Sequence, residues 1–121
     1  MPENNQSPAA LSVALQHIVA ELRRQVEMEG WSAEHDDEHP PGVLAMAGAC
    51  YAQHGARQLQ EPGATSTIGR ASPAFWPWER EWWKPKNARY DLVRAAALIT
   101  AEIERMDRAS MKVNFESEGK A

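Results

Sequence analysis

Tryptophan is concentrated in one short part of this chain, and this concentration constrains the fold more than any other feature. Four of the five tryptophans lie within Trp76–Trp83, whereas the chain of 121 residues has only two Phe and two Tyr. Prolines at positions 73, 77 and 85 disfavour a long helix or a central strand in this region. A chain of this length supports one hydrophobic core. We therefore expect residues 75–86, the tryptophan segment, to form turns that pack over that core.

Three other stretches have the apolar spacing of amphipathic helices, at about residues 8–29, 42–54 and 87–111. No stretch alternates with period two for long enough to predict a sheet. The sequence therefore predicts an all-α fold of three principal helices, with a long loop and the tryptophan segment packed over them. The expected single domain covers residues 8–111, between a flexible N-terminus at 1–7 and a flexible tail at 112–121.

The ends of the expected helices carry typical capping residues. Ser7 and Pro8 suit the N-cap and the first position of the first helix, and Gly30 suits its C-terminal end. Asn87 suits the N-cap of the third helix, whereas Gly55 is expected to end the second.

Helical spacing also predicts which faces are buried. In the first helix the expected stripe is Leu11, Ala14, Leu15, Ile18, Leu22 and Val26. In the third helix it is Leu92, Ala95, Ala96, Ile99, Ile103 and Met106. The second helix is rich in Ala and Gly, so we expect it to lie centrally and to approach another helix closely. Its Cys50 is interpreted as a small buried hydrophobic residue.

Charge and composition argue against several classes of protein. The net charge of −4 argues against general nucleic-acid binding. The single cysteine excludes an internal disulfide and fits a reducing cytoplasm. The longest apolar run, Val43–Ala52, is far shorter than the roughly 20 residues of a membrane helix. No secretory signal is expected at the N-terminus. We therefore expect a cytoplasmic protein with no membrane partner.

Acidic and histidine side chains form the most concentrated chemical cluster of the sequence. The six consecutive residues of this histidine–acid segment are candidate metal ligands: Glu34, His35, Asp36, Asp37, Glu38 and His39. Imidazole and carboxylate groups suit a divalent metal such as magnesium, manganese or zinc. A structural alternative is a solvated loop whose acids favour the positive N-terminus of the second helix. A third interpretation is an acidic surface that faces a partner.

The aromatic and basic residues farther along the chain favour ligand binding. Indole rings stack on nucleic-acid bases, and neighbouring cations bind phosphate. The candidate ligand-binding residues are Trp31, His35, Trp76, Trp78, Trp82, Trp83, Lys84, Lys86 and Arg89. The structural alternative is that the tryptophans complete a core that has few other aromatic residues. Individual indoles are expected to divide between these two roles.

Three blocks of sequence resemble a family of small, mostly uncharacterised phage and prophage proteins. They are E-G-W-x-x-E-H-D-D-x-H within residues 25–44, W-P-W followed by W-W-K-P within Trp76–Pro85, and R-x-D-L-V-x-A-x-A-L-I-x-A-E-I-E-R at Arg89–Arg105. This resemblance implies an accessory role in host takeover or counter-defence.

A second resemblance is to all-α nucleotide pyrophosphohydrolases of the MazG type, in which E-x-x-E and E-x-x-D pairs hold magnesium. Residues 34–37 and 104–107 each read E-x-x-D, whereas the chain contains no E-x-x-E.

Two functions follow as expectations. The first is a binding protein that captures a host protein or a small anionic, nucleotide-like ligand, and that also forms a homo-oligomer. The alternative is a metal-dependent nucleotide hydrolase, with Asp36, Asp37, Glu38 and Glu102 holding the metal and Arg89 or Lys86 neutralising phosphate charge. Both functions require the histidine–acid segment and the tryptophan segment to meet over the helices.

Overall fold

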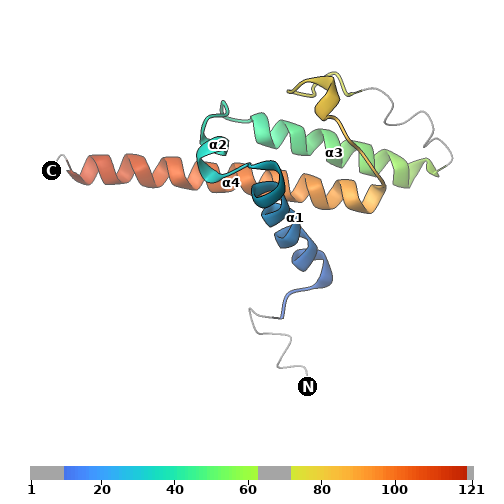
Figure 1. The fold of residues 1–121 in the computed structure, drawn as a ribbon, viewed down its shortest axis with the longest axis horizontal. Coiled ribbons are helices and arrows are strands. Elements are labelled where there is room, and N and C mark those ends of the chain that lie inside the picture. Colours follow the sequence, from blue (N-terminus) through green and yellow to red (C-terminus); the bar gives the residue numbers. More distant parts are fainter. Residues whose placement is uncertain (1–9, 63–71, 120–121) are drawn as a thin grey trace.

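The structure of this protein is a computed structural model that describes residues 10–62 and 72–119. All regular structure in these residues is helical (Figure 1). The elements are α1 (Val13–Glu29), α2 (Ala33–Asp37), α3 (Val43–Gln60), the 3-10 turn η3 (Arg80–Trp82) and α4 (Ala88–Gly119). The predicted all-α fold with three principal helices, here α1, α3 and α4, is confirmed.

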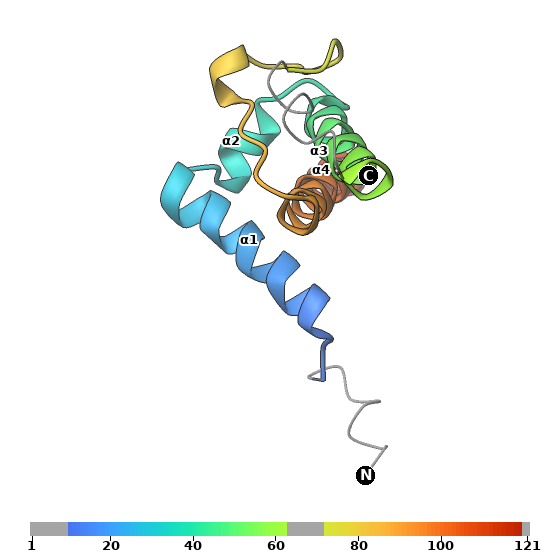
Figure 2. The same ribbon diagram turned by 90° about the vertical axis from the view of Figure 1, so that its right-hand side faces the viewer.

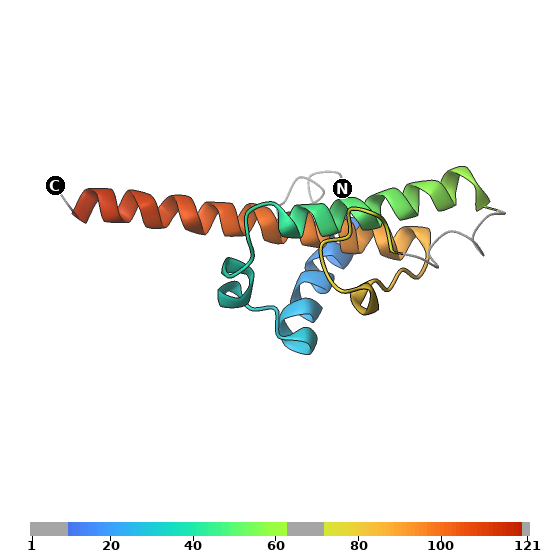
Figure 3. The same ribbon diagram turned by 90° about the horizontal axis from the view of Figure 1, so that it is seen from above.

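Helices α3 and α4 lie side by side along the long axis of the molecule, and α1 crosses α4 at an angle (Figures 1 and 3). They are antiparallel, because the start of α3 contacts Glu102 and its later part contacts Leu92. The C-terminal part of α4 extends beyond α3 (Figure 3). Seen along these helices, α2 and the tryptophan segment lie on one side of the pair (Figure 2).

Two glycines of α3 allow its close approach to α4. A Cβ atom at Gly48 would lie 2.9 Å from Cγ1 of Ile99 and 3.0 Å from the carbonyl oxygen of Ala95. A Cβ atom at Gly55 would lie 3.0 Å from the carbonyl oxygen of Ala88. The close contact expected from the small residues of this helix is therefore present. The expectation that Gly55 ends the helix is wrong, because this glycine is a packing residue and α3 continues to Gln60.

The observed helix ends agree in part with the sequence. Gly30 ends α1 with φ 73°, and the Asn87 side chain accepts a hydrogen bond from the Tyr90 N–H at 2.8 Å, as predicted. However, α1 begins at Val13 rather than near residue 8, because the Ser12 hydroxyl accepts a hydrogen bond from a first-turn N–H. Ser7 and Pro8 lie outside the described residues. Helix α4 continues beyond the expected end near residue 111 to Gly119.

The predicted buried faces of α1 and α4 are largely wrong. In α1 the buried residues are Glu21 and Gln25, while the expected stripe is exposed at Leu11, Ala14, Leu15 and Val26 and half-buried at Ile18 and Leu22. In α4, Ala95 is buried and Ala96 half-buried, but Leu92, Ile99, Ile103 and Met106 are exposed. The residues that α4 buries are Asp91, Ala95, Ala97, Leu98, Ala101 and Glu102. Because α4 packs against both α3 and α1, its small and charged residues occupy the contacts.

The core lies where α3, α4 and the tryptophan segment meet. It consists of Leu44, Ala47, Cys50, Tyr51, Trp83, Ala95, Leu98 and Ala101. The burial of Cys50 is as predicted, and burial raises the pKa of its thiol.

In the described part of the chain, none of the helices has an apolar stretch that would reach across a bilayer.

Candidate functional site

The tryptophan segment divides its indoles between the core and an open pocket. Trp83 turns into the core and packs on Tyr51, with ring centroids 4.6 Å apart. The Lys84 N–H donates to the Tyr51 hydroxyl at 3.0 Å, which holds the backbone beside the core. Trp82, one residue earlier in the turn η3, is 50% exposed. As expected, some indoles are therefore buried and others line a pocket.

The histidine–acid segment and the tryptophan segment meet, as both expected functions require. The ring of Trp78 lies 5.8 Å from Trp31 and 5.4 Å from His39. His35 stacks on Trp31 at 6.5 Å with an interplanar angle of 11°, and its ring lies 5.0 Å from that of His39. Helix α2 carries His35, and the Ser32 hydroxyl accepts from the His35 N–H at 3.2 Å at the start of this helix. His39 lies just beyond α2, where its N–H donates to the Asp36 carbonyl oxygen at 3.2 Å.

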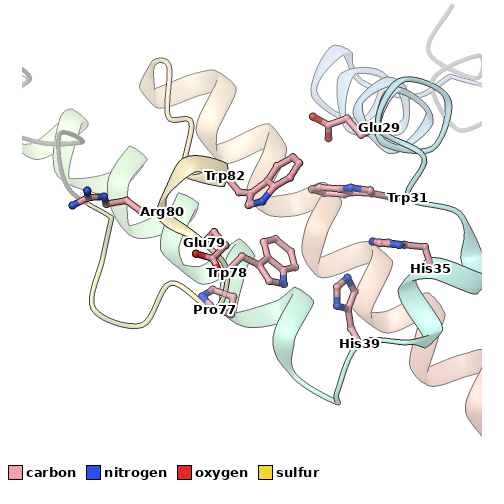
Figure 4. Close-up of a pocket in the computed structure, with 9 residues that line it drawn as sticks. All are labelled: Glu29, Trp31, His35, His39, Pro77, Trp78, Glu79, Arg80 and Trp82. Atoms are coloured by element: carbon pink, nitrogen blue, oxygen red, sulfur yellow. The ribbon is translucent and has the colours of Figure 1, made fainter.

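These rings surround a pocket with a volume of about 710 Å³, which we call the aromatic pocket (Figure 4). Its lining residues are Glu29, Trp31, His35, His39, Pro77, Trp78, Glu79, Arg80 and Trp82. In Figure 4 the three indoles and two imidazoles are gathered together, while the Arg80 side chain extends away from them. The volume is within the range of about 300–1,000 Å³ that small-molecule sites have.

The wall of the aromatic pocket that contains Trp78 is tied to the core. The Trp76 indole N–H donates to the carbonyl oxygen of Glu79 at 3.0 Å, which fixes the turn that carries Trp78. Trp76 itself packs edge-on against Trp78 at 5.4 Å and against Tyr51 at 5.5 Å. The pocket is therefore built on the core rather than on a free loop.

Charged groups of both signs border the aromatic pocket. Glu29 and Glu79 provide carboxylates, and Arg80 provides a guanidinium group. Burial lowers the pKa of His39, and the neighbouring His35 lowers it further, so that the His39 imidazole favours its neutral form.

A smaller adjoining cavity shares four lining residues with the aromatic pocket and leads to further cations. The shared residues are Glu29, Trp31, Trp78 and Trp82, and the cavity also touches Lys84 and Arg94.

Arg94 is a fixed part of this inner wall. Its guanidinium donates to the hydroxyls of Tyr51 at 3.0 Å and Tyr90 at 2.8 Å, and to the Lys84 carbonyl at 3.1 Å. Its Nε atom lies 3.8 Å from the buried carboxylate of Glu21. Burial alone would raise the pKa of Glu21, but hydrogen bonds from Arg24 and Gln25 and the charges of Arg24 and Arg94 lower it overall.

The six candidate metal ligands do not share one site. Asp37 pairs with Arg108 at 2.9 Å, and Glu34 and Glu38 are exposed. Asp36 is buried with an unpaired Oδ1 atom, and burial raises its pKa. Across residues 10–62 and 72–119, no three His, Cys, Asp or Glu side chains are arranged to hold a metal ion. The two imidazoles of the segment instead line the aromatic pocket.

The carboxylates of the histidine–acid segment also do not cap the N-terminus of α3. The buried Glu102 accepts from the Ala45 N–H at 3.1 Å and from Arg105 at 2.6 Å. Burial alone would raise the pKa of Glu102, but these hydrogen bonds lower it overall. Because Glu102 neighbours Ile99 and Ile103, the sequence suggests that it faces inward, which its burial confirms, whereas its predicted place in a metal site is not supported by these contacts.

The other predicted ligand-binding residues lie outside the aromatic pocket. Trp76 lines the smaller cavity, and Trp83 belongs to the core. The Lys86 ammonium lies 4.5 Å from the Tyr90 ring, and Arg89 contacts His17 at 3.0 Å. Arg80 and Arg94 belong to the cations near the tryptophans that the sequence suggests as phosphate ligands, whereas Glu29 and Glu79 are not predicted as ligand-binding residues. The sequence signal for Glu79 is its position between Trp78 and Trp82.

A buried pair joins α3, α4 and the tryptophan segment, and the sequence did not indicate it. His54 Nδ1 lies 2.8 Å from Asp91 Oδ2, and Asp91 Oδ1 accepts from the Lys86 N–H at 2.9 Å. Asp91 is 0% exposed and His54 6%. These contacts fix the end of the tryptophan segment to both helices.

No protein-family model, curated protein or solved structure matches this chain.

Proposed function

We propose that this protein is a cytoplasmic binding protein that captures a nucleotide-like ligand in the aromatic pocket. The observation that carries the proposal is the gathering of three indoles and two imidazoles, from two distant segments, around one pocket of about 710 Å³. A half-exposed indole such as Trp82 provides a flat surface on which a base stacks. A purely structural tryptophan would be covered instead.

The charged groups support a nucleotide over a purely apolar ligand. Glu29 and Glu79 are acceptors for the exocyclic amino group of a base. Arg80 at the pocket and Lys84 beside Trp82 are cations for the phosphates. The Lys84 ammonium lies 5.5 Å from the Trp82 ring, so a base stacked there has a cation within reach of its phosphates.

Titration of the protein with nucleoside mono-, di- and triphosphates tests this proposal. We expect binding heat and quenching of tryptophan fluorescence, with the uncharged nucleoside binding more weakly than its phosphates. Trp82→Ala should weaken binding about tenfold or more, because a stacked base contributes about 1–3 kcal/mol. The matched control is Phe75→Ala, which removes an exposed aromatic side chain outside the pocket and should leave affinity unchanged.

Other outcomes would favour the alternatives. If no nucleotide binds and a host protein is retained by the parent but not by Trp82→Ala, the pocket binds a protein segment instead. If phosphate or pyrophosphate is released above a chelator-treated control, the protein is a metal-dependent hydrolase. The resemblance to phage and prophage proteins supports an accessory role in host takeover or counter-defence for any of these activities.

A further inference from the structure

The rings that line the aromatic pocket are inclined to one another rather than parallel. The ring of Trp78 makes an angle of 57° with that of Trp31 and of 42° with that of His39. Two parallel rings hold a flat molecule between them, whereas inclined rings can turn their faces toward one point. The face of an indole is electron-rich and attracts cations. Next to the surface that Trp82 offers to a base, the pocket therefore has a corner suited to a compact positive group.

The tryptophan segment already contains one contact of this kind. The Lys84 ammonium lies 5.5 Å from the centre of the Trp82 ring, within the distance at which a cation is attracted to an aromatic face. Among the described residues, no lysine or arginine lies over Trp31 or Trp78 in the same way. The rings of Trp31 and Trp78 are therefore available to a cation that a ligand brings.

The charged side chains of the aromatic pocket also favour a positive group inside it. Glu29 and Glu79 bring two carboxylates to the lining, whereas the single cation of the lining, Arg80, extends away from the rings (Figure 4). Lys84 and Arg94 line the adjoining cavity and not the aromatic pocket itself. The negative groups therefore lie at the pocket, and the positive groups lie around it.

The carboxylate of Glu29 is free to accept hydrogen bonds from a ligand. Its Oε1 atom lies 3.6 Å from Nη1 of Arg24, which is longer than a hydrogen bond. Arg24 instead donates to both carboxylate oxygens of Glu21, at 2.9 and 2.8 Å. Arg24 thus stays close enough to orient Glu29 but does not occupy its acceptor oxygens.

The imidazole of His39 does not oppose a cation in the pocket. Burial lowers the pKa of His39, and the neighbouring His35 lowers it further. The charges of Glu38 and Glu102 act in the opposite direction without reversing this shift. The His39 ring therefore favours its neutral form and adds an aromatic wall without adding a positive charge.

We propose that the ligand of the aromatic pocket is a nucleotide whose base carries a positive charge, as guanine does when its imidazole ring is methylated on the second nitrogen. The base stacks on Trp82, its charged N-methyl group lies against Trp31 and Trp78, and its amino group donates to a carboxylate of the pocket. The phosphates point outward to Arg80 and Lys84. This inference rests on the proposed function, since it names the class of base that the same pocket binds.

Calorimetric titration with two matched nucleotides tests this inference. The first is 7-methylguanosine monophosphate, in which the ring is positively charged. The second is 7-methyl-7-deazaguanosine monophosphate, which has the same shape and the same methyl group but an uncharged ring. We expect the charged nucleotide to bind about tenfold more tightly than the uncharged one. This preference should decrease as salt is added, because salt screens the carboxylates at the open pocket.

Replacement of a pocket carboxylate tests the origin of the preference. Glu29→Gln keeps the size of the side chain and removes its charge, so the preference should fall to about threefold or less while the uncharged nucleotide binds as before. Glu79→Gln is the second variant. Glu27→Gln is the matched control, since Glu27 is exposed on α1 outside the aromatic pocket, and it should leave the preference unchanged. Circular dichroism checks that the variants retain their helices.

Each contrary outcome identifies which proposal fails. Equal binding of the charged and uncharged nucleotides would overturn this inference and leave the proposed function intact. If no nucleotide binds at all, the proposed function fails and this inference fails with it. If tetramethylammonium binds as tightly as the charged nucleotide, the pocket recognises a cation without a base, which would also overturn the inference. A preference that survives both Glu29→Gln and Glu79→Gln would overturn the role of the carboxylates.

Discussion

Trp82 and Trp83 are adjacent in the chain but have opposite environments. Trp83 is 8% exposed and packs against Tyr51 and His54, whereas Trp82 is 50% exposed and forms a wall of the aromatic pocket. The turn η3 ends between them, and the backbone beyond is held by hydrogen bonds to Tyr51 and Asp91. Two identical side chains therefore have different roles because only one of them is directed at the core.

Loss of the Trp83 indole from the core should have the largest effect on stability. Trp83→Ala should lower the free energy of unfolding by about 3–5 kcal/mol, because it leaves a large cavity beside Tyr51. Urea denaturation monitored by circular dichroism measures this change. Trp82→Ala serves as the comparison, and a similar loss in both variants would contradict the division of roles.

Removal of the buried Asp91 carboxylate should have the next largest effect on stability. Asp91→Ala should lower the free energy of unfolding by about 3 kcal/mol, since it leaves the His54 imidazole and the Lys86 N–H without their acceptor. Thermal unfolding measures this loss. Asp107→Ala, an exposed position on the same helix, is the control and should change stability little. An equal loss of stability in the two variants would show that the contacts of Asp91 with His54 and Lys86 contribute little.

Loss of the pocket indole should separate binding from stability. Trp82→Ala should lower the free energy of unfolding by only about 1–2 kcal/mol, less than half the effect of Trp83→Ala, because half of the side chain is already in water. The same variant should lose about tenfold or more in nucleotide affinity. Calorimetric titration and urea denaturation of one preparation measure both quantities. If stability falls and affinity does not, Trp82 belongs to the core rather than to a binding site.

The smallest expected effect is on the pH dependence of stability, and it should leave binding in the aromatic pocket unchanged. The lowered pKa of Glu102 means that its charged form is stabilised in the folded protein. This contribution is present above the usual pKa of a glutamate and is lost as the pH falls through the lowered value. Glu102→Gln should therefore reduce the melting temperature at pH 7, and the difference from the parent should shrink in acid.

The matched control for this pH experiment is Glu104→Gln. Glu104 is exposed on the same helix, and the variant should show no such pH dependence. Nucleotide affinity should be unchanged in both variants. If the difference in melting temperature between Glu102→Gln and the parent grew as the pH falls, this would contradict the assigned direction of the pKa shift.

Local sequence signals gave the helices but not their buried faces. Gly30 and Asn87 cap their helices as predicted, because capping depends on a few neighbouring residues. The burial of Glu21 and Gln25 was not predictable, because it depends on Arg94, which is distant in the sequence. Spacing predicts that the apolar stripes of α1 and α4 face the core, but spacing shows only that a face is apolar and not what covers it.

The sequence also predicts the residues of the candidate site only in part. The sequence indicated Trp31, Trp78, Trp82 and His35 as ligand-binding residues, and the structure brings them to one pocket. It also indicated Lys86 and Arg89, which lie elsewhere because they precede and begin α4 and contact Tyr90 and His17. Composition identifies residues that are suited to binding a ligand. Whether they meet in one pocket depends on how the histidine–acid segment and the tryptophan segment run over the helices.

By itself the sequence determined an all-α chain with three principal helices and a proline-limited tryptophan segment, because helix formation and proline geometry act over a few residues. Only the tertiary structure decided that Trp83 enters the core, that Trp82 borders a pocket, and that most of the apolar stripe of α4 remains exposed. These outcomes depend on contacts between residues far apart in the chain, such as the hydrogen bonds from the Lys84 N–H to Tyr51 and from the Lys86 N–H to Asp91.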